Sequence, residues 1–183
     1  MTEFDTAPIP ISEVHRSIGS IVAAATSLEL TLGEAVSSLT RSPLTALLVQ
    51  GERGGTLIGM ACRLLDRGIG STEDEERSGK TRRLGLLSAE DTAMFQVALA
   101  QAETLLKGRD NVVHSLWLAN MEPGVIHGQR TTRARQYVRR WTLAELERLR
   151  QDLANAQADI FICSWNTSGS GMSRMEPRTG DVF

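Results

Sequence analysis

Residues 88–114 read SAEDTAMFQVALAQAETLLKGRDNVVH, a stretch that predicts a central helix and carries the residues best suited to chemistry. It opens on Ser88-Ala89-Glu90-Asp91, which has the form of a capping box for the first turn of a helix. Apolar residues then recur at helical spacing along one face: Phe95, Ala98, Leu99, Ala102, Leu105 and Leu106. We expect this helix to continue through Gly108 and to carry the segment Arg109-Asp110-Asn111-Val112-Val113-His114 at its end.

On the N-terminal side, a second and longer helical pattern precedes this stretch. Residues 1–10 contain Pro8 and Pro10 and predict an extended lead-in, after which Ser12 can cap a helix. The apolar positions that follow are three or four residues apart: Val14, Ile18, Ile21, Ala25, Leu28, Leu32, Val36 and Leu39. A helix of this length spans roughly 40 Å and could form the spine of a bundle.

The region between these two helices predicts shorter helical pieces. Ser42-Pro43 indicates a stop and a restart, since proline suits the first turn of a helix. The glycines of residues 51–55 then indicate a break, and helical spacing resumes up to Gly68. We expect residues 70–83, which are polar and charged, to be mobile.

On the C-terminal side, the segments 115–121 and 125–133 flank Glu122-Pro123-Gly124, which predicts a short β-hairpin or an irregular insert. Thr142-Leu143-Ala144-Glu145 is a second capping box, and it opens a last helix with Leu146, Leu149, Leu153, Ala156 and Ile160 on one face. From Asn166 onward the chain is polar and glycine-rich. We expect one all-α domain over residues 11–165, a bundle of four to five helices, followed by a disordered tail over 166–183.

The overall composition is that of an ordinary globular protein, with 41% hydrophobic residues and 4% aromatic residues. No apolar run reaches the ~18 to 20 residues of a membrane span, and we see no signal peptide, so we expect a cytoplasmic protein without a membrane partner. Cys62 and Cys163 lack metal-ligand spacing and are expected to be reduced core residues. The net charge of −2 argues against a generic nucleic-acid coat protein but allows a local basic patch.

His114 is the histidine with the most suggestive neighbours. Asp110 precedes it by four residues, so on a helix its carboxylate could orient the imidazole. Arg109 and His114 lie about 140° apart around a helix axis, so one helix does not easily focus both on one atom. Two copies related by a two-fold axis could do so across a shared cleft. The alternative is an ordinary polar helix end, with the histidine placed favourably against the helix dipole.

Arginine, a polar residue, then three residues and a histidine is the R-x4-H pattern of the HEPN superfamily of ribonucleases, and residues 109–114 match it in full. The wider chain is similar to HEPN proteins in its long first helix, its motif followed by Ser115-Leu116-Trp117, its insert and its last helix. The resemblance covers residues 11–165. It implies a metal-independent endoribonuclease without a cofactor, commonly a toxin or phage-defence effector, whose site forms in a homodimer and which an antitoxin or regulatory protein can control.

The resemblance also implies roles for individual residues. His114 would act as general base or acid while a ribose 2'-hydroxyl attacks the adjacent phosphate, and Arg109 would stabilise the developing charge. Asp110 would orient His114, and Asn111 would bind a phosphate or hold the helix end. A first-helix acid, here Glu29, can support such sites, and a solvated residue beside the apolar stripe is the alternative for Glu29. Leu116 stands where toxins paired with nucleotidyltransferase antitoxins often carry a modified tyrosine, which puts that mode of control in doubt.

A cluster of arginines follows the motif and suits an RNA-binding track made through phosphate contacts. Its members are Arg130, Arg133, Arg135, Arg139 and Arg140. Tyr137 and Trp141 lie among them and could stack on bases. A solubilising hairpin whose rings pack on the bundle explains the same residues. Two other functions therefore stay open: a non-catalytic HEPN-like dimer that binds RNA or a partner protein, and a helical adaptor unrelated to RNA.

Overall fold

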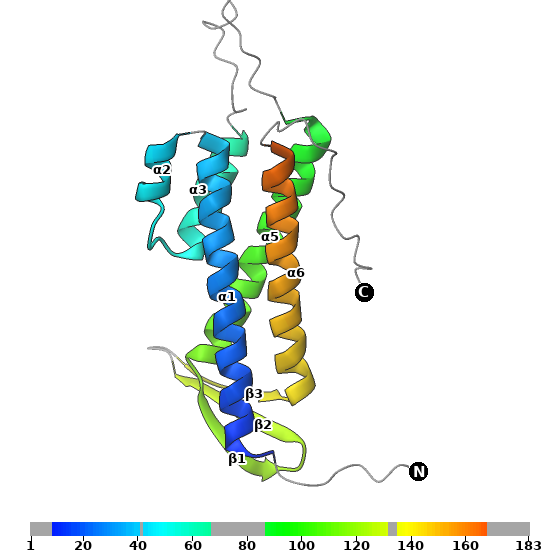
Figure 1. Cartoon of the computed structure of the whole chain (residues 1–183). Helices are drawn as coiled ribbons and strands as arrows, with labels where there is room; N and C mark the ends of the chain where they lie inside the picture. The colour runs from blue at the N-terminus through cyan, green and yellow to red at the C-terminus, as the bar shows by residue number, and fades with distance from the viewer. Residues whose placement is uncertain (1–8, 41, 67–86, 132–134, 168–183) are drawn as a thin grey trace, which may run out of the picture. The chain divides into compact units, whose positions relative to one another are not determined.

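The computed structural model describes residues 9–40, 42–66, 87–131 and 135–167, which are mostly helical (Figure 1). In these ranges the elements are α1 (Ile11–Thr40), α2 (Pro43–Leu48), α3 (Gly54–Asp66), α5 (Ala89–Val113), β1 (Leu116–Glu122), β2 (Val125–Thr131), β3 (Gln136–Trp141) and α6 (Leu143–Thr167). The chain divides into two compact units. The first comprises Met1–Thr26 with Thr104–Ala154, and the second Ser27–Glu103 with Asn155–Phe183. Helices α1, α5 and α6 contribute residues to both.

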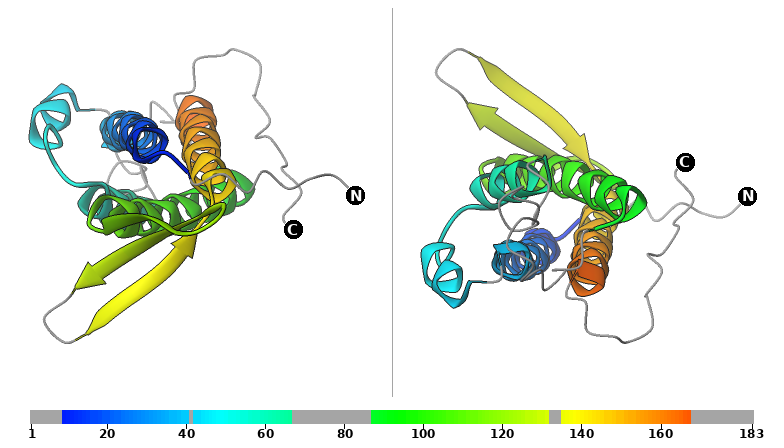
Figure 2. Two further views of the ribbon diagram at one scale, coloured as in Figure 1. Left: turned by 90° about the horizontal axis from the view of Figure 1, so that it is seen from below. Right: turned by 90° about the horizontal axis from the view of Figure 1, so that it is seen from above.

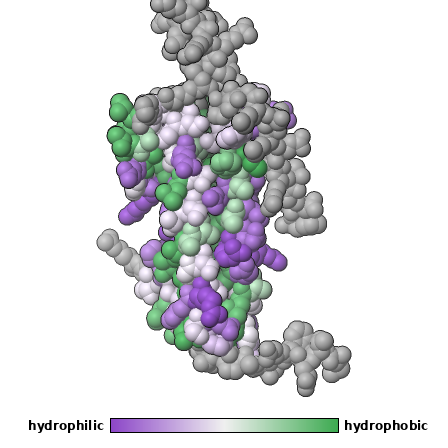
Figure 3. Space-filling view, viewed as in Figure 1, coloured by the Kyte–Doolittle hydropathy of each residue, from purple (hydrophilic) through white to green (hydrophobic). Residues whose placement is uncertain are grey.

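The second unit has a core of aliphatic side chains with a single phenylalanine. Its buried residues from α1 and α3 are Leu28, Leu32, Ala35, Val36, Leu39, Leu57, Ile58, Ala61 and Leu65. Those from α5 and α6 are Phe95, Ala98, Leu99, Ala102, Ala156, Ile160 and Cys163. These positions repeat every three or four residues, so the spacing predicted for the long helices is confirmed. Outside this core, α2 exposes Leu44, Leu47 and Leu48, and Figure 3 shows hydrophobic residues in green where α2 lies in Figure 1.

The first unit combines helix ends with the sheet. Its buried side chains are Val14, Ile21, Ala25, Leu106, Val112, Ile126, Trp141, Leu146 and Leu153.

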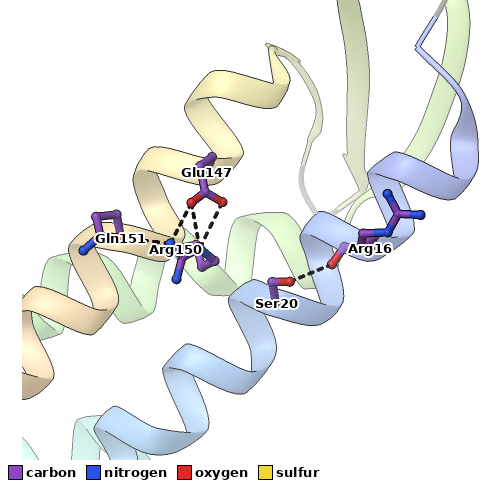
Figure 4. Close-up of polar contacts among 5 residues, drawn as sticks. All are labelled: Arg16, Ser20, Glu147, Arg150 and Gln151. Atoms are coloured by element: carbon purple, nitrogen blue, oxygen red, sulfur yellow. Dashed lines mark hydrogen bonds and ion pairs between the residues drawn. The ribbon is translucent and has the colours of Figure 1, made fainter.

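On the exposed side of α6 in this unit, Arg150 donates to Glu147 and to Gln151, and Ser20 of α1 donates to the carbonyl of Arg16 (Figure 4). The hydrogen bond from Arg150 lowers the pKa of the Glu147 carboxyl. Such exposed pairs contribute little to stability.

The insert between α5 and α6 is an antiparallel sheet in the order β1-β2-β3. Gly124 has φ +68° in the turn between β1 and β2, a conformation that suits glycine, and the predicted hairpin is confirmed. Strands β2 and β3 run side by side in both views of Figure 2, paired from Ile126 with Trp141 to Thr131 with Gln136. The mostly helical class is confirmed, and the insert differs from the expectation by this third strand. Residues 136–140 are all exposed, so β3 lacks the alternation of apolar residues that reveals a strand.

Both predicted caps are confirmed at the starts of their helices, and the reciprocal bonds of a capping box are present at Thr142. The Asp91 N–H donates to Ser88 Oγ at 3.0 Å. The Glu145 N–H donates to Thr142 Oγ1 at 3.1 Å, while the Thr142 N–H donates back to Glu145 Oε2 at 2.7 Å. The restart at Pro43 is confirmed as the first residue of α2.

Three predicted boundaries differ from the structure. Helix α1 begins at Ile11, so Ser12 lies inside it rather than capping it. Helix α3 begins at Gly54, so the break predicted over 51–55 is shorter and is made at Gly51, with φ +79°. Helix α6 runs to Thr167, past the predicted domain end at 165. The expected mobile segment 70–83 and the tail from 168 lie outside the described residues.

No helix of the described part is both long and apolar enough to cross a membrane.

Candidate functional site

The C-terminal end of α5 is anchored by hydrogen bonds from the residues that follow it. The helix ends at Val113, one residue before His114, whose N–H donates to the Asp110 carbonyl at 3.1 Å. Trp117 Nε1 donates to the Val112 carbonyl at 3.1 Å. Ser115 Oγ donates to the Asn111 carbonyl at 2.6 Å. Carbonyls at a helix end lack partners within the helix, so these bonds hold the predicted segment in place.

Close packing against α6 supports the same helix end. At Gly108, an added Cβ would lie 3.3 Å from Leu149 Cδ1 of α6. That distance is tighter than ordinary carbon contacts, so a glycine lets α5 approach α6 here. Val112 is fully buried. The polar residues of the motif are therefore carried on a helix turn whose apolar side is packed.

Arg109 and Asp110 form an ion pair with each other. Arg109 Nη1 donates to Asp110 Oδ1 at 2.9 Å, and the side chains are 23% and 49% exposed. The imidazole of His114 is exposed, and within the described residues it has no side-chain hydrogen bond. The carboxylate expected to orient His114 instead lies on Arg109 in the single chain. His114 is thus exposed, whereas Arg109 is half-buried, with its Nε enclosed, and is tied to Asp110.

Asn111 connects the motif to the arginine cluster. Its Oδ1 accepts a hydrogen bond from Arg130 Nη1 of β2, a residue 19 positions further along the chain. A bond that involves a charged guanidinium is stronger than a neutral one. This bond therefore joins the end of α5 to the central strand of the sheet. Its two residues were selected from the sequence for separate reasons.

A cavity of about 350 Å³ lies where these elements meet. It is lined by Asn111, Ser115, Gly128, Arg130, Tyr137, Val138, Arg139 and Trp141. The guanidinium of Arg139 stacks on Trp141, with Cζ 3.8 Å from the ring centroid. Such a cation–π contact orders the cation over the ring. The cavity thus combines positive charge with flat aromatic surface, which suits a planar ligand carrying negative charge.

Gly128 lines the cavity and lets Trp141 and Ser115 approach the sheet closely. It lies in the middle of the sheet, opposite Trp117 on one side and Arg139 on the other. A Cβ at this position would meet Trp141 Nε1 at 3.2 Å and Ser115 Cβ at 3.4 Å. Sequence reasoning missed Gly128 and Ser115. A glycine inside a predicted strand was the available signal, because such glycines mark a close approach of another group.

The remaining residues of the predicted site are dispersed. Arg135 is exposed ahead of β3, and Arg140 forms an ion pair with Glu122 of β1. His127 Nε2 lies 3.8 Å from the other oxygen of the Glu122 carboxylate. Arg133 lies outside the described residues. Of the five predicted RNA-binding arginines, the cavity therefore includes Arg130 and Arg139.

Glu29 belongs to the second unit, where it has a local structural partner. Its Oε1 accepts a hydrogen bond at 3.2 Å from the N–H of Gly54, the first residue of α3. A carboxylate at a helix N-terminus is stabilising because the N–H groups there carry partial positive charge. This contact explains why a charged residue sits beside the apolar stripe of α1.

The two cysteines, also in the second unit, are not activated as nucleophiles. Burial raises the pKa of the Cys163 thiol to about 11, and burial also raises the pKa of Cys62. Neither forms a disulfide. Among the described residues, no group of three or more His, Cys, Asp or Glu side chains is placed to hold a metal ion.

No protein-family model, curated protein or solved structure matches the chain.

Proposed function

We propose that this chain is a metal-independent endoribonuclease of the HEPN type that works as a homodimer, in the manner of a toxin or phage-defence effector. The observation that carries the proposal is the hydrogen bond between Asn111 and Arg130. It joins the Arg109–His114 segment to a surface of arginines and aromatic rings. Asn111 and Ser115, which flank His114 in the sequence, line the same cavity as these arginines and rings. Phosphate-binding charge and base-stacking surface are the features that recognition of single-stranded RNA needs.

The chemistry follows from the residue types. His114 takes the proton from a ribose 2'-hydroxyl as that oxygen attacks the neighbouring phosphorus. The bond from phosphorus to the 5'-oxygen breaks, the 5'-oxygen takes up a proton from water, and His114 later releases its proton to water. The products are a 2',3'-cyclic phosphate and a 5'-hydroxyl. Arg109 stabilises the charge on the phosphoryl oxygens. To do so, its guanidinium releases the Asp110 carboxylate and binds the phosphate in its place. DNA lacks the 2'-hydroxyl and is not cut.

Pairing of two copies supplies the geometry that one helix lacks. On an ideal helix Arg109 and His114 would lie about 140° apart around the axis, and here His114 lies one residue beyond the end of α5. In a two-fold dimer, His114 of one protomer faces Arg109 of the other, and the dimer holds two equivalent sites. Each site then contains one residue from each chain.

Cleavage of bulk RNA in EDTA tests the proposal directly. Wild-type protein should leave 2',3'-cyclic phosphate ends, and His114→Ala and Arg109→Ala should each abolish cutting while eluting as dimers. His15→Ala is the matched control, because His15 is an exposed histidine of α1. Intact RNA with wild-type protein, or full activity in His114→Ala, would contradict the proposal.

Mixing the two inactive variants tests the shared site. A mixed dimer of Arg109→Ala and His114→Ala has one intact site and one site that lacks both residues. Random exchange of protomers should therefore restore about a quarter of wild-type activity. Recovery of none, with exchange verified by differently tagged chains, would place both residues in one protomer's site.

The second candidate is a dimer that binds RNA without cutting it. The ion pair between Arg109 and Asp110 favours it, since an arginine already neutralised by its neighbour can serve charge balance alone. In that case RNA stays intact with every variant, and Arg139→Ala weakens RNA binding. A helical adaptor unrelated to RNA would show no change in affinity for polyanions when Arg135 and Arg139 are neutralised.

A further inference from the structure

The cavity next to the motif has flat walls as well as positive charge, so it offers a ligand more than attraction for phosphate. Two of its walls are flat: the Tyr137 ring, which is 52% exposed, and the guanidinium of Arg139 stacked on Trp141. Tyr137 and Arg139 are two residues apart on β3, so their side chains emerge on the same face of the sheet. Flat surfaces on one face of a strand suit the stacking of a flat ligand.

The backbone spacing of Tyr137 and Arg139 leaves room for one base between their side chains. Residues i and i+2 of a strand are roughly 6.8 Å apart. That is close to twice the roughly 3.4 Å between stacked nucleotides, so one ring fits between two flat groups at this separation. Opposite Arg139 on β2, Gly128 presents no side chain, and a methyl group there would already crowd Trp141 and Ser115. The cavity volume of about 350 Å³ lies at the lower end of the ~300 to 1,000 Å³ range of ligand pockets.

Arg130 and Arg139 line this cavity, and each carries a positive charge. Arg130 is held by Asn111, and Arg139 is held by Trp141, so both guanidinium groups are positioned before any ligand arrives. Side chains ordered in advance lose less entropy on binding, which favours affinity. A nucleotide carries a phosphate on each side of its sugar, and two arginines match that arrangement.

We propose that this cavity is a binding subsite for one unpaired nucleotide of an RNA strand, whose base stacks between Tyr137 and Arg139 while Arg130 and Arg139 contact the flanking phosphates. This inference deepens the proposed function and rests on it for the identity of the strand. The subsite selects single-stranded RNA, because a base inside a duplex has both faces covered by its neighbours.

Binding of a non-cleavable strand tests the subsite apart from catalysis. The probe is a fluorescein-labelled 2'-O-methyl RNA of mixed sequence and no secondary structure, titrated with the full chain and followed by fluorescence anisotropy. Stacking on one aromatic side chain predicts that Tyr137→Ala weakens binding roughly 5- to 150-fold, with the lower end expected for a half-exposed ring. Tyr137→Phe keeps the ring and should bind like wild type.

Two further measurements distinguish base stacking from attraction by charge and from unfolding of a variant. The same strand annealed to its complement should bind wild type and Tyr137→Ala equally, because its bases are not available. Arg148→Ala removes one exposed positive charge of α6 and is the charge control for Arg139→Ala. Arg139→Ala should weaken single-strand binding more than Arg148→Ala does. Circular dichroism of each variant verifies the fold.

Equal affinity of folded Tyr137→Ala and wild type for the single strand would overturn the inference. So would competition by free mononucleotide as effective as that by the strand, since the site would then hold a small molecule instead. Neither result bears on cleavage by His114, which the EDTA assay measures separately. Loss of binding in Tyr137→Ala together with uncut RNA would instead keep the subsite and remove the nuclease.

Discussion

Arg130 of β2 donates a hydrogen bond to the side-chain oxygen of Asn111, which lies in the last turn of α5. This contact ties the orientation of the sheet's central arginine to the helix that carries His114. A change at either residue is therefore expected to alter both stability and RNA binding.

Removal of the amide should free Arg130 at a small cost in stability. We expect Asn111→Ala to lower the free energy of unfolding by about 1 kcal/mol, because the bond is charge-assisted but exposed. Asn111→Asp retains an acceptor and should be no less stable than wild type. Urea titration followed by circular dichroism measures both. A loss of several kcal/mol in the alanine variant would show that Asn111 supports more than this contact.

Replacement of Arg139 by lysine should separate charge from planarity. Lysine keeps the positive charge but lacks the flat guanidinium that stacks on Trp141. We expect Arg139→Lys to preserve the salt dependence of RNA binding. Arg139→Ala should lower its slope by about 0.7 for one lost contact to a single strand. Anisotropy titrations at several salt concentrations give the slopes, and equal slopes for wild type and alanine variant would remove Arg139 from phosphate binding.

Trp117→Phe should weaken the end of α5. Phenylalanine fills much of the same space but has no N–H, so the Val112 carbonyl loses the donor now at 3.1 Å. The expected loss of stability is about 1 kcal/mol, the usual net contribution of one such bond, together with a smaller loss of packing. Hydrogen exchange should show faster opening of the last turn of α5. Unchanged exchange there would indicate that water replaces the indole.

The capping box at Thr142 should also contribute about 1 kcal/mol to the free energy of unfolding. Thr142→Ala removes the acceptor of the Glu145 N–H, and such substitutions cost about 1 kcal/mol. Thr142→Ser keeps the hydroxyl and serves as the matched control. Thermal unfolding compares the two variants. A Ser variant that is destabilised as much as the Ala variant would show that packing of the methyl group, and not the cap, is responsible.

Cys163 should make the stability fall in alkaline solution. Its pKa is raised to about 11 in the folded protein from a reference value of 9.0, because burial disfavours the thiolate. The folded state therefore keeps the proton where the unfolded state has lost it, and stability decreases as the pH rises from about 9 to 11. Cys163→Ala should lose stability less steeply over this range. Denaturant titrations at a series of pH values measure the slopes.

The long helices could be predicted because their signals are local. Buried residues of α1 and α5 repeat every three or four positions, and each helix start at Ser88 and Thr142 is encoded within four residues. Strand β3 could not be predicted in the same way. Its residues 136–140 are exposed, and it exists through backbone pairing with β2 rather than through a pattern of its own.

The candidate site likewise has one part that the sequence predicts and another part that it does not. The segment 109–114 is contiguous and was visible in the sequence, as were the arginines after it. The contact between Asn111 and Arg130 depends on the register of β2 against the end of α5, which no local pattern specifies. The pairing of Asp110 with Arg109 was missed for a related reason. The helical spacing favoured His114, whereas a long arginine side chain can fold back onto its own neighbour.

Strand β3 is an edge of the sheet, and among the described residues no further strand covers its outer side. Open edges of this kind are templates for aggregation, and charged side chains along them are a common protection. Arg139 and Arg140 place positive charge on this edge, and we expect them to disfavour its pairing with the sheet of another copy. A variant stripped of both charges would be prone to precipitate, and light scattering should accompany any RNA titration made with it.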